Sequence, residues 1–406
     1  MGEKHQHSIM QGQTDTRYQD WAWPLWPIVP LYPYGRRRTL RQEVVKDKIW
    51  TFEQSQGILY VVVPIRMSAI ALESGGLLIY APVAPTPECI RLVRELEAQH
   101  GEVQAIVLPT ISGIEHKVFV GPFARHFPQA QVYVAPHQWS FPVNLPLSWL
   151  GFPRKRTHIL PADSRQNPLG DEFDYAILGP IELGPGRFAE VALFHKRSRT
   201  LFVTDSVLAI PPEPPEIIQL EPYPLLFHAK DDALHKVLDS PENRRKGWQR
   251  ISLFAFYFSP STLNVANLFQ SIRDAFAAPD RSKQAYFGWF PFQWQDNWQQ
   301  SFHALSRQGR LFVAPILQTL ILNRAPQATL DWVNRVQQWN FQQIIPCHMQ
   351  AVIQADGEQF RQAFAFLEKP QSTLEGNRLP EADFQLLQTL NRALTQTRIV
   401  PPAKLD

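Results

Sequence analysis

The stretch Ala105–His116 reads AIVLPTISGIEH and passes from an apolar run into a Glu-His pair. Two later apolar runs end in a similar way, because TLFVTD closes at Asp205 and QIIPCH closes at His348. Short runs of this kind are typical of buried strands, and open α/β folds carry their chemistry at the carboxyl ends of such strands. We therefore predict an α/β fold whose strand ends bring together oxygen and imidazole ligands, a set that suits a divalent metal ion.

The composition indicates a folded, soluble protein, since 44% of the 406 residues are hydrophobic and 19% are charged. The net charge of +3 is small and both signs are interspersed, so we expect no nucleic-acid partner. The two cysteines, Cys89 and Cys347, favour a reducing compartment. No apolar run reaches the ~20 residues that a transmembrane helix needs. Basic clusters at Arg36–Arg38 and Arg244–Lys246 leave peripheral contact with an anionic membrane as an alternative to plain solvation.

Three regions are expected along the chain. Residues 1–48 are rich in Trp, Tyr, Pro and Arg, and predict an aromatic arm over the body because repeated prolines forbid a regular helix. Residues 49–370 form the body, in which 206–325 are a Pro-rich and aromatic-rich insertion or cap. Residues 371–406 are a polar tail with one helix, Glu381–Thr395.

Local patterns place the elements of the body. Gly75-Gly76 lies between two β-rich runs and predicts a hairpin. Thr86 is expected to be the N-cap of a helix that starts at Pro87. A loop is expected over Ser112–His116, followed by a short helix from Lys117 and later by a helix over Thr329–Trp339. The segments 174–183, 190–195 and 201–205 are expected to be successive strands. Strands alternating with helices favour an α/β layer architecture.

The order of elements and ligands resembles the metallo-β-lactamase fold superfamily, an αβ/βα four-layer sandwich with the motif Thr-His-x-His-x-Asp-His. Thr110 matches the first residue of the motif, Glu115 stands for its Asp, and His116 keeps its last His. Ile111 and Gly113 stand where the first two histidines would be. In the later motifs Arg187 replaces a third histidine, whereas Asp205 and His348 match the family's residues.

The resemblance implies that the ligands of one of two metal positions are lost and those of the other are kept in kind. It implies a site for one divalent ion (zinc, iron or manganese) held by Glu115, His116, Asp205 and His348. Glu115 is one methylene longer than the Asp of the motif, which alters its reach. Arg187 would carry a fixed positive charge near the lost metal position and could hold an anionic group of a substrate.

Several segments resemble more closely an uncharacterised family of cyanobacteria and plastids that carries a domain of unknown function (DUF4336). They include SGIEHKVFVGPFARHFP, ALFHKRSRTLFVTDS and GWQRISLFAFYFSP. The resemblance covers most of residues 20–350 and implies a photosynthetic setting, with the protein in the cytoplasm or the plastid stroma. It implies no activity.

These observations lead to alternative hypotheses of function. A metal-dependent hydrolase would act on an ester, thioester or phosphoester, with Asp205 and Arg187 in catalytic roles beside the metal. A non-catalytic descendant of the superfamily would bind a small molecule or a protein partner as an assembly factor, because four ligands on one ion leave no open position for water. An iron oxidoreductase is a third hypothesis, since His and carboxylate ligands suit iron too.

Overall fold

The computed structural model describes residues 21–23, 30–111, 114–140, 144–184, 186–307, 309–368 and 379–404. Most of the first twenty-nine residues of the predicted arm, Ser112, Gly113 and the first residues of the predicted tail lie outside these ranges. Among the described residues, eight strands form a first sheet in the order β1-β3-β4-β5-β6-β7-β8, with β2 also paired to β3. Its strands are β1 (Leu31–Tyr32), β2 (Leu40–Val45), β3 (Ile49–Ile58), β4 (Val61–Ala71), β5 (Leu77–Tyr80), β6 (Val103–Leu108), β7 (Gln131–Val134) and β8 (Thr157–Ile159).

A second sheet has the order β15-β14-β11-β10-β9 in the described part of the chain. Its strands are β9 (Phe173–Glu182), β10 (Arg187–His195), β11 (Thr200–Val203), β14 (Gln343–Pro346) and β15 (Ile353–Gln354). A short ribbon pairs β12 (Leu263–Val265) with β13 (Phe292–Trp294). The helices are α2 (Pro87–His100), α3 (Ile114–His126), α4 (Glu216–Gln219), α5 (Tyr223–Ala229), α6 (Pro241–Tyr257), α7 (Leu268–Ala277), α8 (Trp298–Ser306), α9 (Pro315–Leu320), α10 (Pro326–Val336), α11 (Gly357–Ala363) and α12 (Gln385–Gln396).

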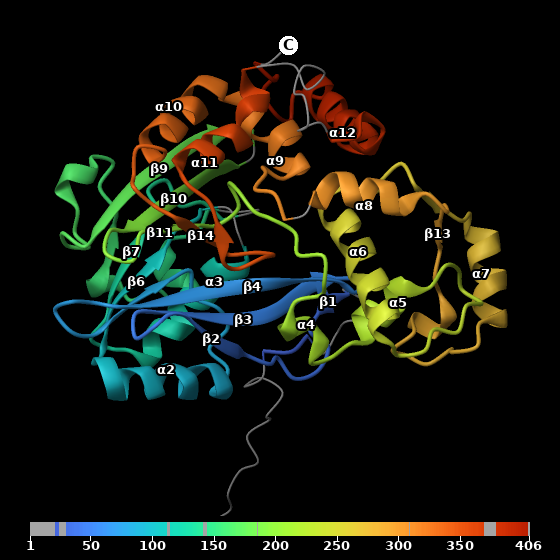
Figure 1. Ribbon diagram of the computed structural model, residues 1–406, viewed down its shortest axis with the longest axis horizontal. Coiled ribbons are helices and arrows are strands. Elements are labelled where there is room, and N and C mark those ends of the chain that lie inside the picture. Colours follow the sequence, from blue (N-terminus) through green and yellow to red (C-terminus); the bar gives the residue numbers. More distant parts are fainter. Residues whose placement is uncertain are drawn as a thin grey trace, which may run out of the picture.

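The two sheets face each other, and helices cover their outer faces (Figure 1). Buried side chains of both sheets, among them Tyr80, Val191 and Phe202, form the core between them. Helices α2 and α3 pack on the outer face of the first sheet, and α10 and α11 pack on that of the second. This is the αβ/βα four-layer sandwich, so the predicted fold class is confirmed.

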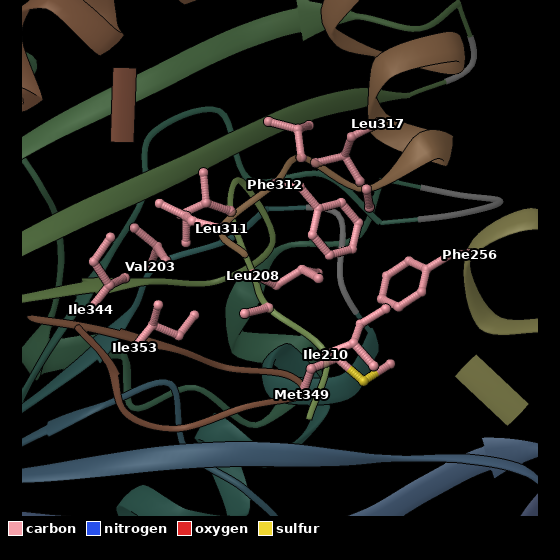
Figure 2. Close-up of a cluster of buried hydrophobic side chains, with 14 of the residues drawn as sticks. Val203, Leu208, Ile210, Phe256, Leu311, Phe312, Leu317, Ile344, Met349 and Ile353 are labelled. Atoms are coloured by element: carbon pink, nitrogen blue, oxygen red, sulfur yellow. The ribbon is translucent and has the colours of Figure 1, made fainter. Parts of the chain in front are cut away.

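The segment between β11 and β14 covers one end of the sandwich with helices α4 to α9 (Figure 1). Its apolar side chains continue the core of the second sheet: Figure 2 shows Leu208 and Ile210, which follow β11, beside Phe256 of α6 and Phe312. Backbone hydrogen bonds between Leu208 and Phe312 join the start of this segment to the residues that precede α9. No helix among the described residues combines the length and the apolar character needed to cross a membrane.

Several local predictions are confirmed. The strands β6, β11 and β14 cover the three apolar runs, and Thr86 caps α2 through its hydroxyl, which accepts from the backbone N–H of Cys89. The expected loop over Ser112–His116 is wrong at its end, because α3 begins at Ile114 and holds Glu115 and His116 in its first turn. A glutamate is favourable there, since the amino end of a helix carries partial positive charge.

Two fully buried histidines predict how stability depends on pH. Burial lowers the pKa of His228 in α5 to about 3 and that of His195 in β10 to about 4. Both pKa values lie below the ordinary value near 6.5. Below about pH 6.5 the two histidines therefore bind protons in the unfolded chain but not in the folded chain. Stability from these groups is therefore present above pH 6.5 and is lost as the pH falls toward 4 and 3.

We expect each histidine to remove about 2 kcal/mol from the free energy of unfolding between pH 7.5 and pH 5. The His228→Gln variant should lack its share, because glutamine carries no titrating proton and can still donate to the Leu59 carbonyl that His228 contacts. Urea unfolding at the two pH values measures the difference. Equal pH dependence in the variant and the wild type would refute the assignment to His228.

Candidate metal site

The predicted site residues come from the start of one helix and the ends of two strands, which lie at the same place. Glu115 and His116 lie in the first turn of α3, Asp205 follows β11, and His348 follows β14. Strands β11 and β14 are parallel neighbours with Val203 opposite Pro346, so Asp205 and His348 each stand two residues beyond a paired position. The carboxyl ends of two parallel strands thus place these two side chains at one edge of the second sheet.

His348 lies between the two carboxylates. Its Nε2 atom is 3.4 Å from an oxygen of Glu115 and 3.3 Å from an oxygen of Asp205. The ring of His116 is 6.2 Å from the ring of His348, measured between centroids. The two histidines are buried, whereas about one third of each carboxylate side chain is exposed, so the group can be reached from solvent.

Both histidines are oriented by backbone carbonyls. Nδ1 of His116 is 3.1 Å from the carbonyl oxygen of Pro82, and Nδ1 of His348 is 3.1 Å from that of Pro64. A carbonyl can only accept, so each Nδ1–H donates and the Nε2 atoms are left for other partners. Nε2 of His116 is buried and has no hydrogen-bond partner among the described residues. Metal-binding histidines are held in this same manner by a hydrogen bond from the second nitrogen.

The electrostatics give the group a net negative charge. Burial by itself would lower the pKa of His348, but the hydrogen bonds and charges of Asp205 and Glu115 raise it well above the ordinary value. Burial would raise the pKa of Glu115, yet the hydrogen bond and charge of His348 hold it below its usual value. Burial, together with the nearby charge of His348, lowers the pKa of His116. One imidazolium between two carboxylates leaves an excess negative charge that favours a cation.

The donor set fits a divalent ion. Two ligand atoms on one tetrahedral metal at about 2.1 Å stand roughly 3.4 Å apart, and the contacts of His348 are of that length. They are longer than the roughly 2.8 Å of a charge-assisted hydrogen bond. In the described part of the chain, however, no three His, Cys, Asp or Glu side chains are arranged to hold a metal ion. The types of donor and the unpartnered Nε2 of His116 therefore fit a metal, but the described side chains are not arranged around one metal position, and His348 would have to release its Nε2 proton to bind one.

Glu190 of β10, which was not among the predicted site residues, positions Asp205. Its fully buried carboxylate accepts hydrogen bonds from the backbone N–H groups of Thr204, Asp205 and Ser206 at 2.9, 3.0 and 2.9 Å. It also accepts from the Ser206 hydroxyl at 2.7 Å. The turn that carries Asp205 is thus built around this one carboxylate. A charged residue inside an otherwise apolar strand, RFAEVALFH, is the signal that could have identified it.

Arg66 of β4 holds the loop of His348 in a comparable way and was also missed. It is 1% exposed, and it donates to the carboxylate of Glu53 and to the backbone carbonyls of Pro346 and Met349. Glu53 lies opposite Arg66 on β3. The pair links the first sheet to the loop after β14, so both sheets contribute to the position of His348.

Two further residues considered from the sequence, Arg187 and Cys347, have other surroundings than the four ligand candidates. Arg187 begins β10 and forms an ion pair with Glu182 at 2.9 Å. Among the described contacts, none joins Arg187 to the four ligand candidates. Cys347 is buried between the sheets, and burial raises the pKa of its thiol well above the ordinary value, so it is unsuited to act as a nucleophile.

The chain matches one protein family over residues 46–366, a family described as "Domain of unknown function (DUF4336)". No curated protein sequence gave a significant match.

Solved structures with a similar fold share little sequence with this chain. The metal-soaked Flv1 flavodiiron core from Synechocystis sp. PCC6803 is 10% identical with a TM-score of 0.41, over 90% of this chain and 71% of that one. A metallo-beta-lactamase from Pontibacter korlensis is 9% identical with a TM-score of 0.37, over 80% of this chain and 99% of that one. A fold shared at this level carries no information on function.

Proposed function

We propose that this chain, which belongs to the family described as "Domain of unknown function (DUF4336)", binds one divalent metal ion and hydrolyses an ester, thioester or phosphoester. The proposed ligands are Glu115, His116, Asp205 and His348, and the ion is zinc, iron or manganese. One observation carries the proposal. Two buried histidines have Nδ1 fixed on backbone carbonyls, Nε2 of His348 faces two carboxylates, and Nε2 of His116 is buried without a hydrogen-bond partner among the described residues.

A divalent ion at this site would lower the pKa of a bound water and polarise the oxygen of the scissile group. Glu190 fixes the turn of Asp205, and Arg66 fixes the loop of His348. Two of the proposed ligands are thus positioned by hydrogen bonds to their own backbone segments. Partial exposure of Glu115 and Asp205 leaves an approach for substrate from solvent. Arg187 is proposed to hold the anionic end of the substrate, for which it would exchange its ion pair with Glu182.

Asp205→Asn is expected to lower kcat/KM for hydrolysis by about 100-fold or more, because it removes one anionic ligand and keeps the shape of the side chain. The assay uses protein loaded with zinc, iron or manganese and chromogenic ester, thioester and phosphoester substrates. Asp174→Asn is the matched control, since Asp174 is an exposed carboxylate on β9 paired with Lys196, and it should hydrolyse at the wild-type rate.

A wild-type rate in Asp205→Asn would contradict the assignment of Asp205. No turnover by wild-type protein that has been shown to contain the metal would contradict hydrolysis but leave the metal site standing.

A second candidate is a non-catalytic scaffold that binds a small molecule or a protein partner. It is favoured by the finding that no three donors among the described residues are arranged around a metal position and by the engagement of Arg187 with Glu182. In this case the His348 ion pairs would serve stability alone. The photosynthetic setting and the cytoplasmic or stromal location implied by the family resemblance apply to both candidates as proposals.

A further inference from the structure

Helix α7 presents its large apolar side chains to solvent. Leu268, Phe269, Ile272 and Phe276 follow helical spacing and share one face, since their positions fall within about 100° around the helix axis. Phe269 is 86% exposed, Phe276 74% and Leu268 68%. A surface helix ordinarily turns such a face toward the core. This helix is therefore inverted relative to the usual amphipathic arrangement.

A different side of α7 packs on the protein through small residues. Ser271 is buried and donates to the carbonyl of Asn267. Gly288 lies so close that a Cβ atom there would stand 2.6 Å from the carbonyl oxygen of Ala275 and 3.0 Å from the Cβ of Ala278. Because the inward side is filled by small side chains against a glycine, the helix cannot turn its phenylalanines inward without rebuilding this contact.

The exposed face continues onto the segments beside α7. Phe287, next to Gly288, is 63% exposed, and its backbone has a positive φ of 58°. An aromatic residue with such a backbone conformation is strained. Val265, just before α7, is also exposed. Helix α7 lies at the end of the long axis of the molecule, far from the two sheets (Figure 1).

The size of this surface distinguishes between possible partners. Together the four side chains of this face and Phe287 expose roughly 650 Å², which is slightly more than the largest apolar patch of a typical monomer. A standard protein interface buries about 800 Å² on each partner, so the patch is smaller than one side of a stable dimer interface. A protruding helix with one bulky apolar face is instead typical of proteins that lie in the interfacial layer of a membrane.

The charges around α7 agree with a membrane surface. Residues 263–290 contain the basic side chains Arg273, Arg281 and Lys283 and the acidic side chains Asp274 and Asp280. The positive excess is slight, so apolar contact would dominate and anionic lipid would add to it.

Most side chains of the basic clusters considered from sequence have partners within the protein, although Arg36 is exposed. Arg37 is buried and donates to the carbonyl of Ser55, and Arg38 pairs with Glu88. Arg244, Arg245 and Lys246 pair with Asp239, Glu213 and Asp231. The clusters therefore offer less free positive charge than the sequence suggests, and neither presents an apolar face like that of α7.

We propose that Leu268, Phe269, Ile272 and Phe276 of α7 insert into the headgroup and upper acyl region of a lipid bilayer that contains anionic lipid. The insertion holds the protein reversibly at the membrane surface, with the two sheets and the candidate metal site in the aqueous phase. It is independent of metal binding and of hydrolysis.

Flotation of the full chain with vesicles of phosphatidylcholine and phosphatidylglycerol, at a molar ratio of about 7:3, tests the proposal. Wild-type protein should float with the vesicles. The double variant Phe269→Ser/Phe276→Ser should bind about 100-fold more weakly, at about tenfold for each phenylalanine removed from lipid. The control Ile159→Ser removes a side chain that is 65% exposed from the edge strand β8 and should bind like the wild type.

A fluorescent label gives an independent reading of insertion. Both native cysteines are buried, so a thiol-reactive environment-sensitive dye will label an introduced cysteine selectively. Dye at Ile272→Cys should shift its emission to the blue on addition of vesicles, and dye at Gln299→Cys, on the exposed surface of α8, should not.

Three results would overturn the proposal. The wild type could fail to float with these vesicles, or Ile159→Ser could lose as much binding as the double variant. Light scattering could also reveal a concentration-dependent dimer that the double variant abolishes, and the patch would then be a protein interface.

Discussion

Glu190→Gln will lower the free energy of unfolding by about 3–5 kcal/mol. Glutamine keeps the shape of the side chain but offers one acceptor oxygen and a donor NH₂ group where the carboxylate accepts four hydrogen bonds. Hydrogen bonds to a charged partner contribute about 1.5–3 kcal/mol each, and buried donors left without acceptors cost more than the bond itself. At least two of the four are lost.

The control for this substitution is Glu182→Gln on the neighbouring strand β9. Glu182 is exposed and pairs with Arg187, so its replacement should change stability by less than about 0.5 kcal/mol. Urea unfolding of both variants gives the comparison. If the proposed site binds metal, Glu190→Gln should also weaken metal affinity by about 10- to 100-fold, as other outer partners of metal ligands do. Equal midpoints in the two variants would show that Glu190 does not hold the turn of Asp205.

Arg66→Met is expected to be comparably destabilising, by about 3–5 kcal/mol, because it leaves the buried Glu53 carboxylate without its partner. The carbonyls of Pro346 and Met349 lose their donor as well. The exposed pair of Arg197 and Glu73 supplies the control, and Arg197→Met should have an effect near zero.

A double-mutant cycle separates the charge pair from the carbonyl contacts. Adding Glu53→Leu to Arg66→Met should recover about 2 kcal/mol or more relative to the sum of the single effects, since the uncompensated charge is then gone. Recovery should stay incomplete, because the carbonyls of the His348 loop remain without a donor. Additive effects of the two substitutions would contradict a direct buried pair.

The sandwich was predictable because its strands are signalled locally. Apolar runs gave β6, β11 and β14, and Thr86 with Pro87 gave the start of α2. The insertion was harder to interpret, since its prolines indicated an insertion or cap and no particular helix, whereas the structure has α4, α5 and α6 in its first part. Proline is compatible with the first turn of a helix. Ser240 followed by Pro241 is such a start, and Ser240 caps α6.

Long-range packing decided what local patterns did not. The turn between β3 and β4 is formed by Leu59 and Tyr60, both with positive φ, where Asn-Gly would be the usual signal. Tyr60 is buried in an aromatic cluster with Tyr34, Phe227 and Tyr286, and its packing compensates for the strained backbone. No pattern around Leu59 could have indicated partners more than 160 residues away in sequence.

The residues of the candidate site also differ in how far the sequence could predict them. The four ligand candidates could be named from sequence because each follows an apolar run or matches a family motif. Arg66 and Glu190 could not be given a role, since a buried charge shows its function only through the groups that it contacts. Arg187 was placed by resemblance alone, and its observed partner is Glu182.

Metal content decides whether the four candidate ligands hold an ion. Elemental analysis would be made of wild-type protein purified without chelator or added metal, of the His116→Ala/His348→Ala double variant, and of a His158→Ala/His303→Ala variant that removes two exposed histidines. We expect close to one zinc, iron or manganese ion per chain in the wild type and in the His158/His303 variant, and none in the His116/His348 variant. Folded wild-type protein without metal, or metal retained in the His116/His348 variant, would contradict this expectation.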